Sequence, residues 1–275
     1  MISEDQLRTW MKQGSIDSSS RTYAAIRGAI QFGPNEQGVT LDVYLQGSYG
    51  NSTNIRGDSD VDVVAELKSS LEPDLDRLDS LHLTNFHTAH KPALYDWDRF
   101  RADVVAELVG SFGSRVVPGS KAFRVEAGSG LLAADVLVAI TFREYFAFRS
   151  PFAPGEFEAG VAFKAIPEGR WVINYPRQHR DNCVLKHAST GTNFKPAVRM
   201  FKNARTYLVD RGGMAPGTAP SYFIESLLYN VPDDLFGGSA QDMFTGITQW
   251  LGGASWSSMV CANGIVPLFG PSPEQ

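Results

Sequence analysis

The sequence has few of the features that mark secreted, membrane or metal-cysteine proteins. Its two cysteines, Cys183 and Cys261, show no metal-ligand spacing and indicate buried or free thiols in a reducing cytosol. The first residues, MISEDQLRTWMKQ, are polar and acidic, which is not the pattern of a signal peptide. The most apolar stretch, residues 131–140, is too short to span a bilayer and contains Asp135. We therefore expect a cytoplasmic protein with no membrane segment.

An excess of positive charge is also missing. The chain has 25 Lys and Arg residues against 30 Asp and Glu residues, for a net charge of −5. General electrostatic attraction to nucleic acid is therefore not expected, and any nucleotide must bind at a local basic site. No internal repeat or low-complexity segment is present. With 275 residues, 43% of them hydrophobic and 20% charged, the chain fits one large globular domain or two packed lobes.

The most informative stretch is residues 47–66, GSYGNSTNIRGDSDVDVVAE. A strand is predicted before it over residues 39–46, and a second strand over residues 61–66. Asp60 and Asp62 stand at i and i+2, so their carboxylates project from one face while the intervening valines point into the core.

Like charges held this close repel unless something neutralises them, and oxygen ligands of this kind suit magnesium or manganese. The alternative for Asp60 and Asp62 is a solvated acidic loop. The alternation of these carboxylates with valines argues against that alternative. Gly47 allows the backbone to approach a ligand closely, and Ser48 adds a hydroxyl, so this turn can hold phosphate oxygens.

The pair Gly47-Ser48 followed by Asp60-x-Asp62 resembles the active-site signature of the DNA polymerase beta-like nucleotidyltransferases. The longer form GSYGNSTNIRGDSDVDVV resembles the bacterial relatives of cyclic GMP-AMP synthase, the CD-NTases, which make cyclic oligonucleotide signals in antiphage (CBASS) defence. The resemblance covers most of the chain, from about Gln46 to Val231. It implies that Gln46, Gly47 and Ser48 contribute to nucleotide binding.

In the resembled family a third catalytic aspartate lies on a neighbouring strand, and Asp135 matches it. A lone carboxylate in an apolar strand is costly unless it is paired or metal-bound, and the alternative here is a carboxylate satisfied by backbone or arginine. Three carboxylates can hold two ions that bind the attacking and leaving oxygens of a phosphoryl displacement. We expect Asp60 and Asp62 to hold two Mg²⁺ ions, with Mn²⁺ as a substitute. We expect Asp135 to hold the ion nearer the acceptor hydroxyl and to accept the proton of that hydroxyl, directly or through metal-bound water. We expect Glu66 to lie outside the metal shell.

The second half of the chain supplies the remaining candidates. The resemblance implies that Lys202, in RMFKNAR, reaches the triphosphate, and that Ser221, in PSYFIESLLYNVP, joins Ser48 and Lys202 in a triphosphate clamp. Tyr222 can stack on a base, or it can be an ordinary core residue. Asn174, in INYPRQHRDN, can present its amide to the edge of uracil, or it can be a turn residue.

Other elements follow from local patterns. A short first helix is predicted to start at Ser3, which forms a capping-box pattern with Gln6. Further helices are predicted over residues 18–32, 97–112, 193–210 and 239–251, together with a helix that opens at Ser221. Strands are predicted over residues 122–126, 131–140, 161–166 and 170–174. Residues 68–92 are polar and poorly periodic, which favours a surface loop. The three histidines in that loop, His82, His87 and His90, lack a convincing metal-ligand set.

We therefore predict an α/β (α+β) polymerase beta-like nucleotidyltransferase fold. Residues 1–175 are expected to form the mixed-sheet catalytic lobe with N-terminal helices, and residues 176–275 a helical lobe that closes the nucleotide pocket. The implied activity joins ATP, UTP or GTP into a cyclic di- or trinucleotide with release of pyrophosphate. The product would act on a downstream effector. We expect a bacterial monomer that uses no duplex DNA and no membrane.

Three other functions remain compatible with the sequence. The first is a transferase with another acceptor, such as an RNA end, a linear oligonucleotide or a protein hydroxyl. The second is a nucleotide sensor without activity, which the intact Asp60, Asp62 and Asp135 argue against. The third is a scaffold that acts through partner contacts. A phosphatase-resistant product from labelled nucleotides would separate cyclic synthesis from all three.

Overall fold

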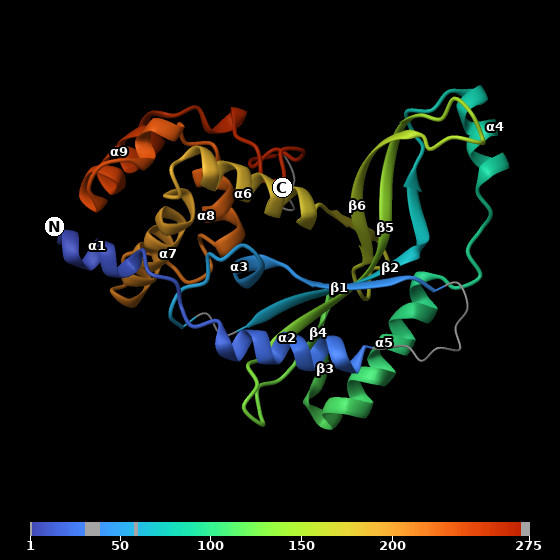
Figure 1. Cartoon of the computed structure of the whole chain (residues 1–275), viewed down its shortest axis with the longest axis horizontal. Coiled ribbons are helices and arrows are strands. Elements are labelled where there is room, and N and C mark those ends of the chain that lie inside the picture. Colours follow the sequence, from blue (N-terminus) through green and yellow to red (C-terminus); the bar gives the residue numbers. More distant parts are fainter. Residues whose placement is uncertain (1, 31–38, 58–59, 271–275) are drawn as a thin grey trace. The chain divides into compact units, whose positions relative to one another are not determined.

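The computed structural model describes residues 2–30, 39–57 and 60–270, and the chain divides into two compact units (Figure 1). A sheet unit comprises Ser18–Leu45 and Asp60–Tyr175. A helical unit comprises Met1–Asp17, Gln46–Ser59 and Pro176–Gln275. This division differs from a single boundary at residue 175, because Leu7 packs into the helical core and the loop after Ser48 bonds to the helices of that unit.

The sheet unit is built on a seven-stranded mixed sheet with the order β1-β2-β5-β4-β3, while β6 pairs with β5 and β7 with β6. Its strands are β1 (Leu41–Leu45), β2 (Val61–Asp74), β3 (Val116–Pro118), β4 (Phe123–Val125), β5 (Ala134–Ala147), β6 (Glu156–Lys164) and β7 (Trp171–Asn174). The mixed sheet confirms the predicted fold class. Every strand predicted from the sequence corresponds to an observed strand, with shifted ends.

Two long strands at the centre of the sheet set the positions of the acidic residues. β2 and β5 run parallel, with Asp62 opposite Asp135. The pairing continues from Val61 to Leu67 and then shifts, so that Leu71 pairs with Thr141. Beyond the shift β2, β5 and β6 extend as a curved arm that reaches towards α4 (Figure 1).

The helices of the sheet unit are α2 (Asp17–Ala29), α4 (Ser80–Ala89) and α5 (Trp97–Phe112). α5 begins after the cap residue Asp96, whose carboxylate accepts a hydrogen bond from the backbone N–H of Arg99. It buries Phe100 and Val104 and packs against β2 and β5, which explains why its pattern was readable from sequence. For α2, residues 31 and 32 of the predicted helix lie outside the described residues.

The predicted surface loop over residues 68–92 is wrong. β2 continues to Asp74 because its second half pairs with β5. α4 follows, capped by Asp79, and its Phe86 packs with Tyr145 and Phe148. These partners are distant in sequence, so no local periodicity announces them.

The helical unit contains α1 (Glu4–Trp10), α3 (Gly47–Gly50), α6 (Pro176–Ser189), α7 (Phe194–Asp210), α8 (Ser221–Tyr229) and α9 (Ala240–Gly253), with short 3-10 turns at Asp233–Phe236 and Trp256–Ser258. α7 supplies buried residues such as Phe194 and Met200 to a core shared with α1, α8 and α9. Ser3 caps α1 and Ser239 caps α9. Among the described helices none has both the length and the apolar character that crossing a bilayer requires.

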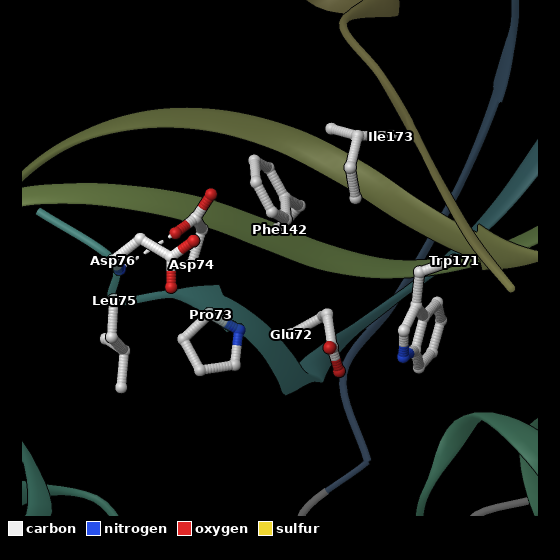
Figure 2. Close-up of a pocket in the computed structure, with 8 residues that line it drawn as sticks. All are labelled: Glu72, Pro73, Asp74, Leu75, Asp76, Phe142, Trp171 and Ile173. Atoms are coloured by element: carbon white, nitrogen blue, oxygen red, sulfur yellow. Dashed lines mark hydrogen bonds between the residues drawn. The ribbon is translucent and has the colours of Figure 1, made fainter.

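A cavity of about 390 Å³ opens along the second half of β2, as Figure 2 shows. Its lining residues are Glu72, Pro73, Asp74, Leu75, Asp76, Phe142, Trp171 and Ile173. Phe142 lies seven residues after Asp135 on β5, so the two side chains project from opposite faces of the sheet. The cavity therefore does not belong to the face that carries the acidic residues.

Candidate active site

Three aspartates gather at one end of the paired strands β2 and β5. Asp62 is the second residue of β2 and lies in register with Asp135 of β5, and Asp60 immediately precedes β2. The valines between and after them, Val61 and Val63, are fully buried. The predicted arrangement of carboxylates outward and valines inward is therefore present, and the structure brings Asp62 and Asp135 together.

Arg124 of β4 holds two of these carboxylates. Its guanidinium donates to both oxygens of Asp60, at 3.0 and 3.1 Å, and lies 3.5 Å from Asp135 Oδ1. Burial raises the pKa of Asp135, the charge of Arg124 opposes that rise, and the charge of Asp60 adds to it. The carboxylates of Asp60 and Asp135 are 37% and 38% exposed, so both remain accessible to a ligand. Sequence reasoning missed Arg124, because its register opposite Asp135 is a tertiary pairing without a local signal.

The donor set fits a hard divalent cation. Asp60, Asp62 and Asp135 offer only carboxylate oxygens, which Mg²⁺ and Mn²⁺ prefer. Glu66 is excluded from the set because it is buried, and its carboxylate accepts hydrogen bonds from Lys68 and Thr141. This agrees with the expectation that Glu66 lies outside the metal shell.

The predicted Gly-Ser turn is a one-turn helix, α3. It starts at Gly47, whose φ of +61° lies in the left-handed region that a side chain disfavours. Gln46 is the cap residue, and its carbonyl accepts a hydrogen bond from the backbone N–H of Gly50. Ser48 is thereby presented at the start of the turn.

Lys202 of α7 is the side chain that meets this turn. Although it carries a charge it is 0% exposed. Its ammonium donates to Ser48 Oγ at 2.7 Å and to the carbonyl of Thr53 at 3.0 Å. Of the three predicted clamp residues, the structure thus joins Ser48 and Lys202. Ser221 is the first residue of α8, after the cap residue Pro220.

The two residues predicted to read the base have different surroundings. Tyr222 of α8 is 44% exposed, so it is not an ordinary core residue, and its ring stacks on His179 with centroids 4.9 Å apart. Burial of its hydroxyl raises the pKa of Tyr222. Asn174 ends β7, where its side-chain oxygen accepts a hydrogen bond from the N–H of Tyr175 at 2.9 Å. Their roles in base recognition stay predictions.

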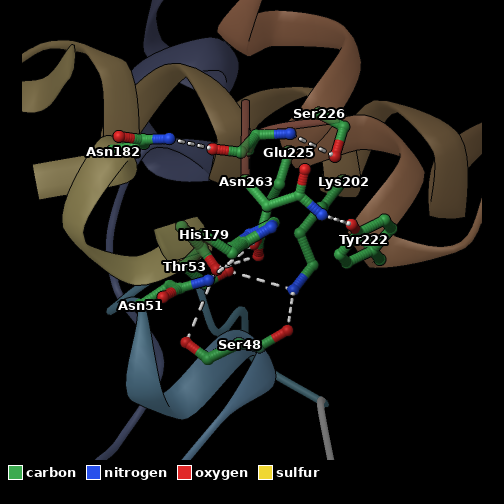
Figure 3. Close-up of polar contacts among 11 residues, drawn as sticks. Ser48, Asn51, Thr53, His179, Asn182, Lys202, Tyr222, Glu225, Ser226 and Asn263 are labelled. Carbon is green, nitrogen blue, oxygen red and sulfur yellow. Dashed lines mark hydrogen bonds and ion pairs between the residues drawn. The ribbon is translucent and has the colours of Figure 1, made fainter. Parts of the chain in front are cut away.

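A buried polar cluster contacts the loop that follows Ser48 (Figure 3). This cluster was not predicted from the sequence. Glu225 of α8 is 2% exposed, and its carboxylate accepts hydrogen bonds from Asn51, Thr53 and His179. Burial pushes the pKa of Glu225 upwards, but these hydrogen bonds and the charge of His179 outweigh it and hold the pKa below its usual range. The signal in the sequence was a single carboxylate inside the largely apolar run FIESLLY.

Glu225, His179 and Cys183 also bring metal-ligand types within 4.8 Å of one another. Two observations favour a hydrogen-bonded cluster over a metal centre. The carboxylate oxygens are already occupied by three donors. Burial raises the pKa of Cys183, which disfavours the thiolate that binds metal.

Comparison with known proteins identifies the family. Residues 181–275 match the model of the cGAS/DncV-like nucleotidyltransferase C-terminal helical domain. A cyclic UMP-AMP synthase of Rhodothermus marinus is 42% identical, over all of this chain and 92% of the relative. The cyclic nucleotide synthase CdnE01 of Staphylococcus haemolyticus is 36% identical, over all of this chain and 93% of the relative. The chain belongs to the bacterial CD-NTase family.

Solved CD-NTase structures agree with this assignment. The Rhodothermus marinus CdnE c-UMP-AMP synthase, solved with Apcpp and Upnpp, matches with a TM-score of 0.89 and 41% identity over all of this chain and 91% of that one. The Elizabethkingia meningoseptica CdnE cyclic dinucleotide synthase, solved with GTP and Apcpp, matches with a TM-score of 0.76 and 27% identity over 99% and 93%. The CD-NTase family consists of metal-dependent nucleotidyltransferases, so this chain is an enzyme of that class.

Proposed function

We propose that this CD-NTase joins nucleoside triphosphates into a cyclic di- or trinucleotide and releases one pyrophosphate for each bond formed. The observation that carries the proposal is the register of Asp62 opposite Asp135, with Asp60 directly before β2. Cyclic nucleotide synthesis by relatives 42% and 36% identical supports the same reaction.

The carboxylates would hold two Mg²⁺ ions, or Mn²⁺ in their place. Asp60 and Asp62 would contact both ions, and Asp135 the one nearer the attacking hydroxyl. When bound, such ions stabilise the charge on the attacking and leaving oxygens of an in-line displacement. Arg124 adds a positive charge that offsets the repulsion between the carboxylates of Asp60 and Asp135.

Asp135 is the residue suited to receive the proton of the attacking ribose hydroxyl. Burial raises its pKa, which makes its carboxylate a better proton acceptor than a fully solvated aspartate. The oxygen freed of its proton then attacks the α-phosphorus, and the bond to pyrophosphate breaks.

The triphosphate would be held by Ser48, Lys202 and Ser221. The ammonium of Lys202 is removed from water and already directed at Ser48 Oγ, so it offers an oriented positive charge to the departing pyrophosphate. Ser221 can contribute its hydroxyl and the free N–H groups at the start of α8.

Base recognition would come from Tyr222 and Asn174, and Gln46 would contribute to nucleotide binding. The exposed part of the Tyr222 ring offers a stacking surface, and His179 behind it fixes its orientation. The amide of Asn174 can donate to and accept from a uracil edge. We therefore propose UTP together with ATP as substrates, in line with the cyclic UMP-AMP product named for the Rhodothermus marinus relative.

The cyclic product would act as a second messenger on a downstream effector in antiphage defence. In this proposal the enzyme works as a bacterial cytoplasmic monomer. GTP is a further candidate substrate, because a relative from Elizabethkingia meningoseptica is named a cyclic dipurine nucleotide synthase.

The test is to incubate the purified protein with all four NTPs and Mg²⁺ or Mn²⁺, treat with phosphatase, and identify the surviving species by mass. We expect a cyclic species that contains UMP. Asp60→Ala combined with Asp62→Ala should abolish it, whereas Asp103→Asn, which alters a carboxylate bonded to Tyr95, should not. Products that phosphatase degrades would instead indicate a linear acceptor, and wild-type turnover by the double variant would refute the metal assignment.

A further inference from the structure

The carboxylate of Glu225 stands at the centre of the polar cluster in Figure 3 and touches the loop that follows the Gly-Ser turn. Asn51 Nδ2 donates to one of its oxygens at 2.8 Å, and the hydroxyl of Thr53 donates to the other. The imidazole of His179 on α6 lies 2.8 Å from the oxygen that Asn51 contacts. Removing a carboxylate from water costs free energy, and three hydrogen-bond partners offset that cost and hold the carboxylate rigidly in place.

Thr53 connects this carboxylate to the phosphate-binding candidates. Its hydroxyl bonds to Glu225, its carbonyl accepts from the ammonium of Lys202 at 3.0 Å, and its N–H donates to the carbonyl of Ser48 at 2.9 Å. A shift of Thr53 would therefore displace both Lys202 and Ser48.

Ser52 lies between Asn51 and Thr53, the two loop residues that bond to Glu225, and its backbone conformation needs support from its neighbours. Ser52 has a φ of +58°, a left-handed conformation that a residue with a side chain adopts at a cost. Its carbonyl accepts a hydrogen bond from Arg199 at 2.6 Å. The loop over residues 51–53 is thus held at three successive positions by side chains of α7 and α8.

We propose that Glu225 is a positioning residue for triphosphate binding, which fixes the loop over residues 51–53 and through Thr53 sets the places of Lys202 and Ser48. The inference rests on the proposed function, since it takes Lys202 and Ser48 as the groups that bind the triphosphate. The path runs from the carboxylate of Glu225 to Thr53, and from Thr53 to both Lys202 and Ser48.

The matched pair Thr53→Val and Thr53→Ser tests this path. Valine has nearly the shape of threonine but lacks the hydroxyl, whereas serine keeps the hydroxyl. We expect Thr53→Val to weaken binding of a non-hydrolysable ATP or UTP analogue with Mg²⁺ by about tenfold, because a hydrogen bond to a buried charge is lost. Thr53→Ser should restore most of the affinity, and Glu225→Gln should weaken it as Thr53→Val does.

Steady-state kinetics and a double variant separate positioning from a loss of fold. The KM for the nucleotide should rise more than kcat falls, and Glu225→Gln should add little to Thr53→Val because both break one connection. Lys186→Met serves as control. It removes an ion pair to Asp233 and a bond to the carbonyl of Val231 in the same unit, so it should lower the melting temperature but not the affinity.

Three results would overturn the inference. Equal affinities of wild type, Thr53→Val and Glu225→Gln would show that the cluster only stabilises the fold, and the proposed function would stand. Stoichiometric zinc in the purified protein would make Glu225 a metal ligand with His179 and Cys183. Failure of the wild-type protein itself to bind the analogue would remove the proposed function and the inference together.

Discussion

Arg124 gives the proposed metal site a positive charge of its own. Its guanidinium bonds to Asp60 and lies near Asp135, and without it two carboxylates would face each other across neighbouring strands. Both partners are more than one-third exposed, so solvent screening limits the contribution of the pair to stability to about 0.5–1 kcal/mol.

This contribution predicts a magnesium-dependent phenotype for Arg124→Gln. In EDTA the variant should melt at a lower temperature than the wild type because the carboxylates repel. Added Mg²⁺ should raise its melting temperature more than that of the wild type. Arg115→Gln is the control, since Arg115 bonds to the carbonyls of Glu126 and Gly128. Equal Mg²⁺ shifts in all three proteins would contradict the prediction.

Asn174 carries the prediction on base choice. Replacing its amide with the shorter hydroxyl in Asn174→Ser removes a group that can donate to and accept from uracil at once. The variant should incorporate less UMP relative to purine nucleotides when all four NTPs compete, as measured by product mass. Asn85→Ser, at a residue that bonds to the carbonyl of Phe148, should leave the ratio unchanged. An unaltered ratio in Asn174→Ser would exclude a base-reading role.

The positions of the acidic residues could be predicted from the sequence, whereas the residues that bond to them could not. Alternation along one strand placed Asp60 and Asp62 on one face, and a carboxylate in an apolar run marked Asp135. Arg124 bonds to Asp60, 64 positions away in the chain, and Glu225 bonds to Thr53, 172 positions away, so no local pattern could assign either residue.

Among the elements, a carboxylate of α1 bonds to the start of α9. Glu4 of α1 accepts hydrogen bonds from the backbone N–H groups of Ala240 and Gln241, the first residues of α9. These bonds lower the pKa of Glu4 from its ordinary value of 4.5. An anion at a helix N-terminus is favoured because it satisfies free N–H groups and complements the helix dipole.

The lowered pKa of Glu4 predicts how its contribution to stability depends on pH. Because the folded pKa is lowered, the stabilisation by Glu4 is complete above pH 4.5 and is lost as the pH falls through the lowered value. Glu4→Gln should therefore melt below the wild type at pH 6–7, and the gap should close at more acidic pH. Asp5→Asn, which removes the same charge from the same helical turn, should show a smaller gap at pH 6–7. A pH-independent gap for Glu4→Gln would refute the linkage.

Elements with a cap and one apolar face were readable from sequence, as α5 and α9 show. Elements that depend on distant partners were not. The second half of β2 exists because β5 lies beside it, and α4 because Tyr145 and Phe148 cover Phe86. The cap residue Asp79 was the local signal for α4, but without an apolar period it could not stand alone.

The chain as a whole is acidic, yet the positive charge that the proposed function requires is buried inside it. The net charge is −5, while Lys202 is fully buried and directed at Ser48. The net charge therefore disfavours binding of polyanions in general, whereas in the proposed function a small triphosphate would bind at the buried ammonium of Lys202.

This distribution predicts no response to duplex DNA. Product yield from NTPs and Mg²⁺ should be the same with and without added duplex DNA, measured by mass after phosphatase treatment. Binding of the nucleotide analogue should change little between about 50 and 300 mM salt, because a buried cation is screened less than a surface one. Stimulation by DNA, or a steep loss of affinity with salt, would reveal a basic surface that the charge balance does not predict.

The register shift in the central strands separates two regions that tolerate change differently. Residues 68–70 of β2 stand between the pair Leu67–Ile140 and the pair Leu71–Thr141, so they take up extra length without a paired residue on β5. An insertion or deletion there alters the arm beyond and leaves the Asp62–Asp135 register intact. One residue added between Val63 and Glu66 would reverse which face the acidic strand end presents. Changes in sequence at residues 68–70 can therefore remodel the far end of the sheet while the register of Asp62 with Asp135 is kept.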